Sequence, residues 1–295
     1  MTAAPRLIDQ AALTLRLKRS AGRGGGPDFL RTRIAEDFAD RLAATLRPFD
    51  VALDLASSGG ETFAALSGRP SASATFRAAA RGLDAGDVII DRSALPLAPE
   101  SVDLLASTLA LHFADDLPGL FAQARRALRP DGLFLAAMLG GDTLIELRRV
   151  FTVAEEEMEG GASPRVMPFA DVRALGSLLQ RAGFALPVID VDRVTVRYNH
   201  PLELFADLRD WGATNVLAER RRTPLRRATL ERAVAEYGAR YADPDGRVRA
   251  TFEIVWLSGW APHPDQQKPL KPGSAKARLA DALGVAEGEA PARAR

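Results

Sequence analysis

A single segment near residue 55 does most to constrain how this chain can fold. Residues 51–55 read as a short apolar strand, residues 56–60 form a loop of small side chains, and a helical pattern begins at Glu61. A strand, a tight loop and a helix start in this order bring backbone N–H groups close to a ligand. Ala56 and Ser58 stand where such loops usually carry glycine. The segment therefore predicts a nucleotide-binding turn in which glycines have been replaced.

The composition bounds the size and the class of the protein. The chain has 295 residues, of which 47 % are apolar, enough for one large domain or a core domain with an appended lobe. Lys and Arg total 39 against 38 Asp and Glu, so no net charge directs the chain to nucleic acid or to a membrane. The absence of cysteine excludes disulfides, thiolate nucleophiles and cysteine-ligated metals. No signal-peptide core and no run of roughly 20 apolar residues occurs, so we expect a cytoplasmic protein without a membrane span.

Strand-like and helical segments alternate through the first half of the chain. Asp28 is placed to cap a helix running to about Leu46, with an apolar stripe of Phe29, Leu30, Ile34, Phe38, Leu42 and Leu46. Apolar runs predict strands at 51–55, 86–90, 102–106 and 132–138, and helical patterns cover 60–67, 116–128 and 142–158. Strands that alternate with helices predict an α/β fold with a mostly parallel sheet and helices on both faces.

Gly160 and Gly161 interrupt this alternation. Beyond them we expect a helix at 169–182, strand-like runs at 186–197, a helix at 201–210, an Arg-rich helical region at 218–241 and a strand at 248–260. The chain therefore divides into an N-terminal helical extension (1–47), a Rossmann-like core (48–160), the C-terminal part of that core with a substrate or partner lobe (161–262) and a mobile tail (263–295).

The order of these elements and three motifs resemble the class I S-adenosylmethionine-dependent methyltransferases. Residues 91–97 resemble the acidic turn after the third strand, residues 101–107 the fourth strand, and residues 128–134 the turn into the fifth strand. The resemblance implies a Rossmann-like sheet that binds S-adenosylmethionine. It implies cofactor-binding positions in the first loop and after the third and fourth strands, at Asp54, Ala56, Ser58, Gly60, Asp91, Arg92 and Ser107.

A longer segment resembles one subgroup of that superfamily. Residues 138–148, which include Gly-Gly-Asp-Thr-Leu-Ile-Glu-Leu-Arg, resemble the subgroup containing the methyltransferase-like assembly factor of respiratory complex I. Residues 159–164, 178–184 and 271–274 fit the same subgroup, whose neighbour is the malonyl-carrier-protein methyltransferase of biotin synthesis. The mitochondrial member is associated with arginine hydroxylation rather than methylation. The resemblance therefore implies a protein substrate, an arginine on a complex I subunit.

The chain departs from the family pattern at two places. The family's first loop reads Asp-x-Gly-x-Gly-x-Gly, and only Asp54 and Gly60 remain of it here. A Cβ is costly where the backbone needs a positive φ. We therefore expect this loop either to bind the cofactor weakly or to serve only the fold. The family also expects an acid about 20 residues further on that binds the ribose hydroxyls. Residues 71–77 contain no carboxylate and offer only Ser73 or Thr75.

Three residues are candidates for catalysis. His112 follows the fourth strand at the carboxyl edge of the sheet, where it is expected to act as a base, to line the pocket, or only to pack on Phe113. Asp142 and Glu146 lie at the start of the helix after the fifth strand, where Glu146 would orient a polar or peptide substrate. Asp142 alternatively caps that helix, and Asp91 alternatively forms a local turn.

Other patterns indicate no chemistry. The arginines at 220–222, 226 and 227 favour a solvated helix face over a docking site, and no aromatic residues are interleaved with them, which disfavours nucleic-acid binding. His200 and His263 are isolated and no metal-ligand spacing occurs, so no metal site is predicted. A Gly-x-Ser-x-Gly motif is absent, which argues against a serine hydrolase.

Two functions from different classes remain open, and a third, small-molecule methylation as in biotin synthesis, fits the segment at 138–148 less well. In the first, the chain is an enzyme that binds S-adenosylmethionine weakly and acts on an arginine presented near residues 140–148, with His112 or a carboxylate taking a proton. In the second, it is a catalytically silent scaffold or assembly chaperone that holds a partner through the 140–165 and 200–260 surfaces. The retained Asp91, His112 and Asp142 favour the first function, and the lost glycines and ribose acid favour the second. The oligomeric state stays open.

Overall fold

The computed structural model describes residues 6–22, 28–68, 72–80, 83 and 86–266. The chain divides into two compact units, Met1–Pro262 and His263–Arg295, and all the helices and strands named below lie in the first. The tail predicted at 263–295 lies outside the described residues from 267 onward.

A sheet of seven strands forms the centre of the described part of the first unit. The strands are β1 (Val51–Leu55), β2 (Ala74–Ala80), β3 (Val88–Ile90), β4 (Val102–Thr108), β5 (Leu128–Leu139), β6 (Ala185–Tyr198) and β7 (Val248–Trp260). Their order is β3-β2-β1-β4-β5-β7-β6. The first five strands pair in parallel, β7 runs antiparallel to β5, and β6 runs antiparallel to β7. The predicted α/β fold with a mostly parallel, Rossmann-like sheet is confirmed.

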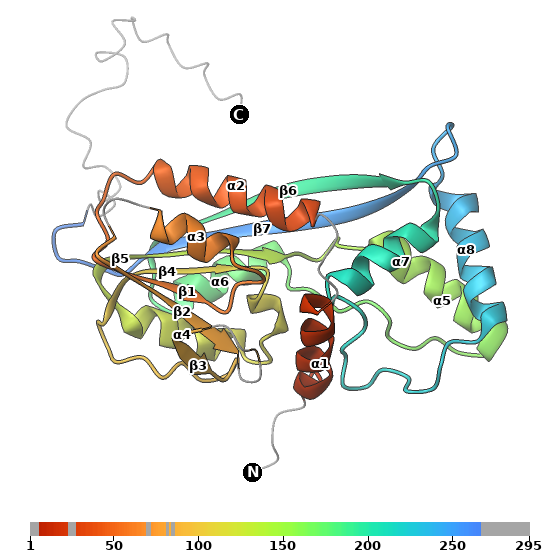
Figure 1. The fold of residues 1–295 in the computed structure, drawn as a ribbon, viewed down its shortest axis with the longest axis horizontal. Helices are drawn as coiled ribbons and strands as arrows, with labels where there is room; N and C mark the ends of the chain where they lie inside the picture. The colour runs from red at the N-terminus through yellow and green to blue at the C-terminus, as the bar shows by residue number, and fades with distance from the viewer. Residues whose placement is uncertain (1–5, 23–27, 69–71, 81–82, 84–85, 267–295) are drawn as a thin grey trace, which may run out of the picture. The chain divides into compact units, whose positions relative to one another are not determined.

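Helices cover both faces of this sheet, as the alternating pattern predicts. α2 (Phe29–Ala43) and α3 (Glu61–Ser67) lie on one face, and α4 (Leu117–Ala127) and α6 (Val172–Arg181) lie on the other (Figure 1). Two apolar clusters fill the two interfaces: Leu30, Ile34 and Phe38 belong to the first, and Phe121 and Leu179 belong to the second. Because the parallel strands are buried on both sides, β5 reads as a continuous apolar run from Leu133 to Leu139.

Four other α-helices occur in the described part of the chain. α5 (Ile145–Glu159) follows β5, and α7 (Pro201–Asp210) and α8 (Arg227–Tyr241) are inserted between β6 and β7. Figure 1 shows these three helices gathered beside one end of the long strands β6 and β7. α1 (Gln10–Ala21) joins this group because Leu13 packs with Val216 and Leu217 of the segment between α7 and α8.

Local signals set several of the observed boundaries. The Asp28 carboxylate accepts the N–H of Arg31 at 2.9 Å and caps α2, as predicted. The helix ends at Ala43, before the predicted end near Leu46, and Leu46 is 96 % exposed, so its assignment to the apolar stripe was wrong. β4 continues to Thr108, which places position 107 inside the strand rather than in the following loop.

Candidate functional site

The loop between β1 and α3 has the shape of a ligand cradle, but three of its backbone donors are already used. The N–H groups of Ala56, Ser57 and Ser58 donate to Ala78 O, Asp54 Oδ1 and Thr108 O at 2.8, 3.2 and 3.0 Å. In a loop that grips a nucleotide, such N–H groups point at the ligand instead. These three consecutive donors therefore stabilise the loop itself.

The end of β4 supports the loop from beneath. Ser107 Oγ donates to Leu55 O at 2.7 Å, and Thr108 donates its N–H to Ser57 Oγ at 2.9 Å. The hydroxyls of Thr62 and Thr108 lie 2.6 Å apart. All of these hydroxyl-bearing side chains are buried. Ser107, a predicted cofactor-binding residue, thus holds β4 to β1.

The loop retains the backbone conformation of a glycine turn. Ala56 has a φ of +55° and Gly59 a φ of +86°. This conformation costs a residue with a Cβ about 1 kcal/mol, so Ala56 carries strain where the family has glycine. A Cβ at Gly59 would overlap the Glu61 carboxylate and lie 2.7 Å from Arg31 Cδ. At Gly60, the surviving family glycine, an added Cβ would meet nothing within 4 Å.

Arg77 of β2 lies against this loop. It stands opposite Asp54 in the β1–β2 register, its Nη2 donates to Gly59 O, and its Nε lies 3.5 Å from Asp54 Oδ2. Asp54 is fully buried. Burial raises the pKa of the Asp54 carboxyl, while hydrogen bonding from Ser57 and the charge of Arg77 act in the opposite direction. The acid that the family uses at this loop is therefore engaged by the chain's own guanidinium.

Within the described residues, the carboxyl end of β2 presents no acid for ribose hydroxyls. The strand spans Ala74–Ala80 and ends in three alanines. Its carboxyl end therefore lies beyond residues 71–77, where the family pattern predicts the acid. Ser73 precedes the strand, and Thr75 pairs with Ala52 near its start. Neither hydroxyl lies at the carboxyl edge, so the two substitute donors considered from the sequence are misplaced.

These residues do not fit S-adenosylmethionine. That cofactor has a positively charged sulfonium and a ribose with two hydroxyls, whereas the guanidinium of Arg77 and the alanines of β2 stand here. The cavity beside the loop, whose lining includes Ser58, has a volume of about 50 Å³, against the roughly 300 Å³ or more of ordinary ligand pockets. We therefore derive no methyl-transfer step from this structure.

Asp91 and Arg92 follow β3 and make local contacts. Asp91 Oδ1 accepts the N–H of Ser93 at 2.9 Å and its hydroxyl at 2.6 Å, which is the local turn considered from the sequence. Arg92 Nη1 donates to Gln10 Oε1 of α1 at 3.2 Å. Burial lowers the pKa of Arg92, whose Nε is buried without a hydrogen-bond partner. A role of these residues in binding adenine stays a prediction.

A larger cavity, of about 260 Å³, adjoins the small one. The two cavities share six lining residues, namely Leu30, His112, Phe113, Leu139, Trp211 and Ala213. The remaining walls are mostly apolar and include Phe151, Phe169, Phe205 and Phe252. Thr143 and Leu144, from the segment that resembles the complex I assembly subgroup, also line it. The candidate site is therefore an aromatic chamber beside the β1–α3 loop.

His112 lines both cavities and is buried, with 8 % of its surface exposed. Leu139 donates its N–H to His112 Nδ1 at 3.5 Å, and the ring lies 4.2 Å from Phe113 and 5.7 Å from Phe169 between centroids. Burial, and then the charge of Arg92, lower the pKa of His112 to about 3. The imidazole is therefore neutral at neutral pH and too weak a base to hold a proton there.

Asp142 lies on the turn between β5 and α5 and pairs with Arg193 of β6. Arg193 Nη2 contacts Asp142 Oδ2 and lies 3.2 Å from Glu253 Oε2 of β7. The residue at the N-cap of α5 is Leu144, with a φ of +54°, so the alternative in which Asp142 caps this helix was wrong. The turn thus places two carboxylates around one guanidinium.

Glu146 points to β7 rather than to the cavity. Its carboxylate accepts the N–H of Thr251 at 3.1 Å and the hydroxyl of Thr251 at 2.5 Å, and Glu146 does not line the large cavity. This pairing ties α5 to the sheet, so the expectation that Glu146 orients a substrate is not supported by its position. Arg148, on the same helix, donates to Met167 O at 3.2 Å.

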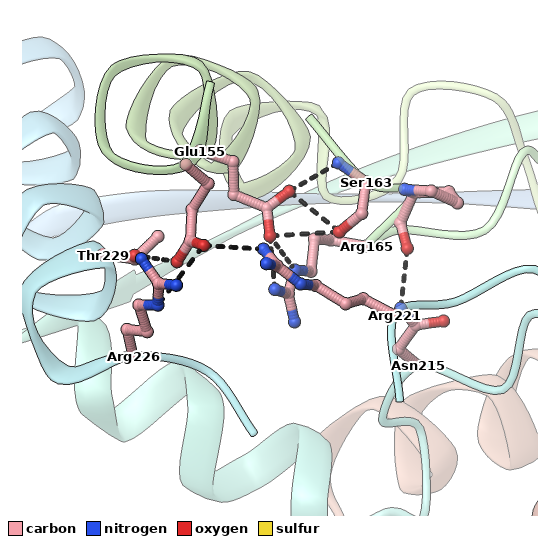
Figure 2. A network of polar contacts seen from close by, with 9 residues as sticks. Glu155, Ser163, Arg165, Asn215, Arg221, Arg226 and Thr229 are labelled. Atoms are coloured by element: carbon pink, nitrogen blue, oxygen red, sulfur yellow. Dashed lines mark hydrogen bonds and ion pairs between the residues drawn. The ribbon is translucent and has the colours of Figure 1, made fainter. Parts of the chain in front are cut away.

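Sequence reasoning missed a buried polar network on α5 (Figure 2). Glu155 is fully buried, accepts the N–H of Ser163 at 2.6 Å and pairs with Arg165, which also lines the large cavity. The signal available from the sequence was an acid on an otherwise apolar helix stripe beside Phe151 and Ala154. The network fixes the chain that follows α5 against one wall of the chamber.

The basic run is neutralised by acids within the chain. Arg221 and Arg226 pair with Glu159 at 2.9 and 3.6 Å, as Figure 2 shows, and Arg220 pairs with Asp9 at 2.9 Å. Residues 218–226 are not helical, so the predicted solvated helix face was wrong for them. These pairs hold the segment before α8 to α5 and to the N-terminus of α1.

Two searches of the described residues gave no result. None of the helices within this part of the chain combines the length and the apolarity that a membrane crossing needs. Within the same residues, no three or more His, Asp or Glu side chains come together in a group that could hold a metal ion.

The strand order, with its final antiparallel strand, and the loop after β1 define a class I methyltransferase fold. The Methyltransferase domain family matches residues 51–136. Two solved structures share the fold at low sequence identity. The YcgJ protein of Bacillus subtilis is 12 % identical, with a TM-score of 0.52 over 77 % of this chain and 99 % of that one. A candidate methyltransferase of Bacillus halodurans is 16 % identical, with a TM-score of 0.50 over 81 % and 100 %.

Similarity along the whole length identifies the family. Mitochondrial arginine-hydroxylase NDUFAF5 of Danio rerio is 38 % identical over 86 % of this chain and 82 % of that protein. The Homo sapiens protein of the same name is 38 % identical over 84 % and 74 %. Malonyl-[acyl-carrier protein] O-methyltransferase of Xylella fastidiosa is 39 % identical over 58 % and 56 %. The chain belongs to the NDUFAF5 arginine-hydroxylase family, as the resemblance of residues 138–148 predicts.

Proposed function

We propose that this chain acts on an arginine side chain of a protein partner, a subunit of respiratory complex I, during assembly of that complex. The observation that carries the proposal is 38 % identity over 86 % of the chain to a protein named arginine-hydroxylase. The subgroup-specific segment at 140–148 supports it, because this segment forms both a wall of the aromatic chamber and a site that holds a guanidinium.

The carboxylates of Asp142 and Glu253 support arginine as the target. Together they bind the guanidinium of Arg193, a planar group with several donors that suits two carboxylates. The side chains of Arg193 and Asp142 are 57 % and 45 % exposed, so a guanidinium from another protein can reach the same acceptors. In this proposal Asp142 positions the substrate, and its carboxylate accepts hydrogen bonds from the target arginine.

A second candidate is a silent scaffold that binds the same partner without chemistry. The contacts of Arg77 with Gly59 and Asp54 favour it, because they occupy the place where an adenosyl cofactor would settle. The three loop N–H groups that bond internally support the same candidate.

Mass spectrometry of complex I subunits separates the two candidates. Cells that lack this chain are complemented with the wild type, with Asp142→Asn, or with Asp37→Asn as a matched exposed control on α2. A subunit arginine that gains one oxygen atom with the wild type and the control, but not with Asp142→Asn, supports the hydroxylase. A gain of one methylene group would indicate methyl transfer instead. Restored assembly with unmodified arginines would establish the scaffold, and unaltered assembly in all cells would overturn both.

A binding experiment tests the guanidinium site directly. Arg193→Ala vacates the two carboxylates, and backbone amide shifts of residues 140–143 report on what replaces the guanidinium. We expect an acetylated Gly-Arg-Gly amide to shift these signals more than the matching lysine peptide. Adding Asp142→Asn should abolish the difference, and equal shifts with both peptides would argue against an arginine-selective site.

A further inference from the structure

The wall of the aromatic chamber contains a hydrogen-bond donor that has no partner among the described residues. Leu139 donates its N–H to His112 Nδ1, so this nitrogen carries no proton and the neutral ring has its proton on Nε2. Nε2 has no hydrogen-bond partner among the described residues, although the side chain is 8 % exposed and lines both cavities. This donor faces the cavities and is free to bond to an acceptor on a ligand.

The charges around the chamber are positive. Arg209 lines the large cavity, as does Arg165, whose charge is paired with Glu155, and the charge of Arg92 lowers the pKa of His112. No Asp or Glu occurs among the residues that line the large cavity. The small cavity has Asp28, whose carboxylate is already used to cap α2. A cation buried here would lack a counter-charge, which is strongly unfavourable.

The remaining walls suit an apolar group. Phe113, Phe151, Phe169, Phe205 and Trp211 line a volume of about 260 Å³. Two other polar side chains of the wall are satisfied: Thr143 bonds to the backbone of Glu253, and Asn215 bonds to Pro164 O and to the N–H of Leu217. His112, Arg209 and Trp211 are the donors left to orient what binds there.

We infer that the chamber binds an apolar, ring-sized ligand that carries a hydrogen-bond-accepting oxygen and no positive charge, with the oxygen accepting from His112 Nε2. This site is separate from the guanidinium site proposed at Asp142 and Glu253, and the inference goes beyond the proposed function. The target arginine stays outside the chamber, and the chamber holds a second, small molecule.

Three probes with one ring system test the inference on the full chain. β-Naphthoate, β-naphthamide and β-naphthamidine differ mainly in the charge and the acceptors of the head group. Binding is measured by calorimetry and by quenching of Trp211, which lines the chamber. We expect the two oxygen-bearing probes to bind at least about tenfold more tightly than the amidine, since only they accept from a neutral N–H donor.

Variants locate the site and its donor. His112→Phe keeps a ring that packs on Phe113 and removes the donor, so affinity for the oxygen-bearing probes should fall about three- to tenfold, the range for one hydrogen bond. His200→Phe, the same change outside the chamber, should leave all affinities unchanged. Ala213→Leu, which fills space in both cavities from an exposed position, should weaken every probe.

The outcomes separate this inference from the proposed function. Tighter binding of the amidine, an unchanged preference in His112→Phe, or no binding of any probe would each overturn the inference. Tight binding of the amidine would also indicate that the target arginine binds inside the chamber. That result would be compatible with the proposed function. If Asp142→Asn modified the subunit arginine as the wild type does, the proposed function would be contradicted. The ligand preference of the chamber would not be affected by that result.

Discussion

Arg77 and Asp54 face each other across the β1–β2 pair, and the guanidinium of Arg77 spans from this buried carboxylate to the carbonyl of Gly59. The pair occupies the corner of the sheet where the fold's relatives place a loop for a nucleotide-like ligand. Burial of Asp54 requires a compensating partner, and the chain supplies it from its own second strand. The fold is thus retained while the groups at its usual ligand corner bond to one another.

Removal of the Arg77 side chain should open this corner. In Arg77→Ala the Gly59 carbonyl and Asp54 lose their internal partner, and the cavity of about 50 Å³ beside the loop gains the volume of a guanidinium. We expect calorimetry with S-adenosylhomocysteine to show affinity at least about tenfold tighter than that of the wild type, a gain of roughly 1.4 kcal/mol. The control is Arg173→Ala on the exposed start of α6. Unchanged affinity in Arg77→Ala would show that the missing ribose acid alone closes the site.

Ala56→Gly should stabilise the protein. The φ of +55° at Ala56 costs about 1 kcal/mol for a residue with a Cβ, and glycine removes that cost. Glycine also raises the entropy of the unfolded chain, which offsets part of the gain. We expect a net gain of about 0.5 kcal/mol in the free energy of unfolding, measured with urea. Ala64→Gly, the same change at an exposed position inside α3, should instead lose about 1 kcal/mol. A loss in both variants would mean that the loop tolerates Ala56 without strain.

Much of the fold could be predicted from the sequence because its signals are local. The apolar run of residues 51–55 coincides with β1, and Asp28 caps α2 where the pattern placed it. The predicted helix boundaries were wrong at two places, because helix ends depend on weak signals. α2 ends at Ala43 rather than near Leu46, and α5 begins at Ile145, after the residue expected to cap it.

The candidate site was less predictable because its contacts join residues distant in sequence. His112 was expected at the carboxyl edge and does line the chamber, since strand order alone places it there. The contact of Arg77 with the loop could not be predicted, because it depends on the β1–β2 register that places Arg77 opposite Asp54. Glu146 was expected to face the substrate, but the direction of its side chain is set by Thr251, a residue of the last strand. A pattern read along the chain does not contain these pairings.

The buried ion pair of Glu155 should matter far more than an exposed one on the same helix. Glu155→Ala leaves Arg165 without its partner and the Ser163 N–H without an acceptor, so we expect a loss of about 3 kcal/mol in unfolding free energy. Glu157 pairs with Arg232 in solvent, and Glu157→Ala should cost less than about 1 kcal/mol. Urea unfolding of both variants checks this, and similar losses would show that burial does not set the energy of the pair.

Acid should destabilise the protein in a way that depends on His112. Its pKa is lowered from 6.5 to about 3 by burial and by Arg92, so in the interval between these values the unfolded chain binds a proton that the folded chain does not. Its contribution to stability is complete above the unfolded value and is lost as the pH falls, by at most about 1.4 kcal/mol per pH unit. His112→Phe lacks this term, so its stability relative to the wild type should improve steadily from about pH 7 to about pH 4 in urea unfolding. Leu111→Ala, a buried neighbour without a titrating group, should run parallel to the wild type, and a parallel course for His112→Phe as well would show that His112 is protonated in the folded protein.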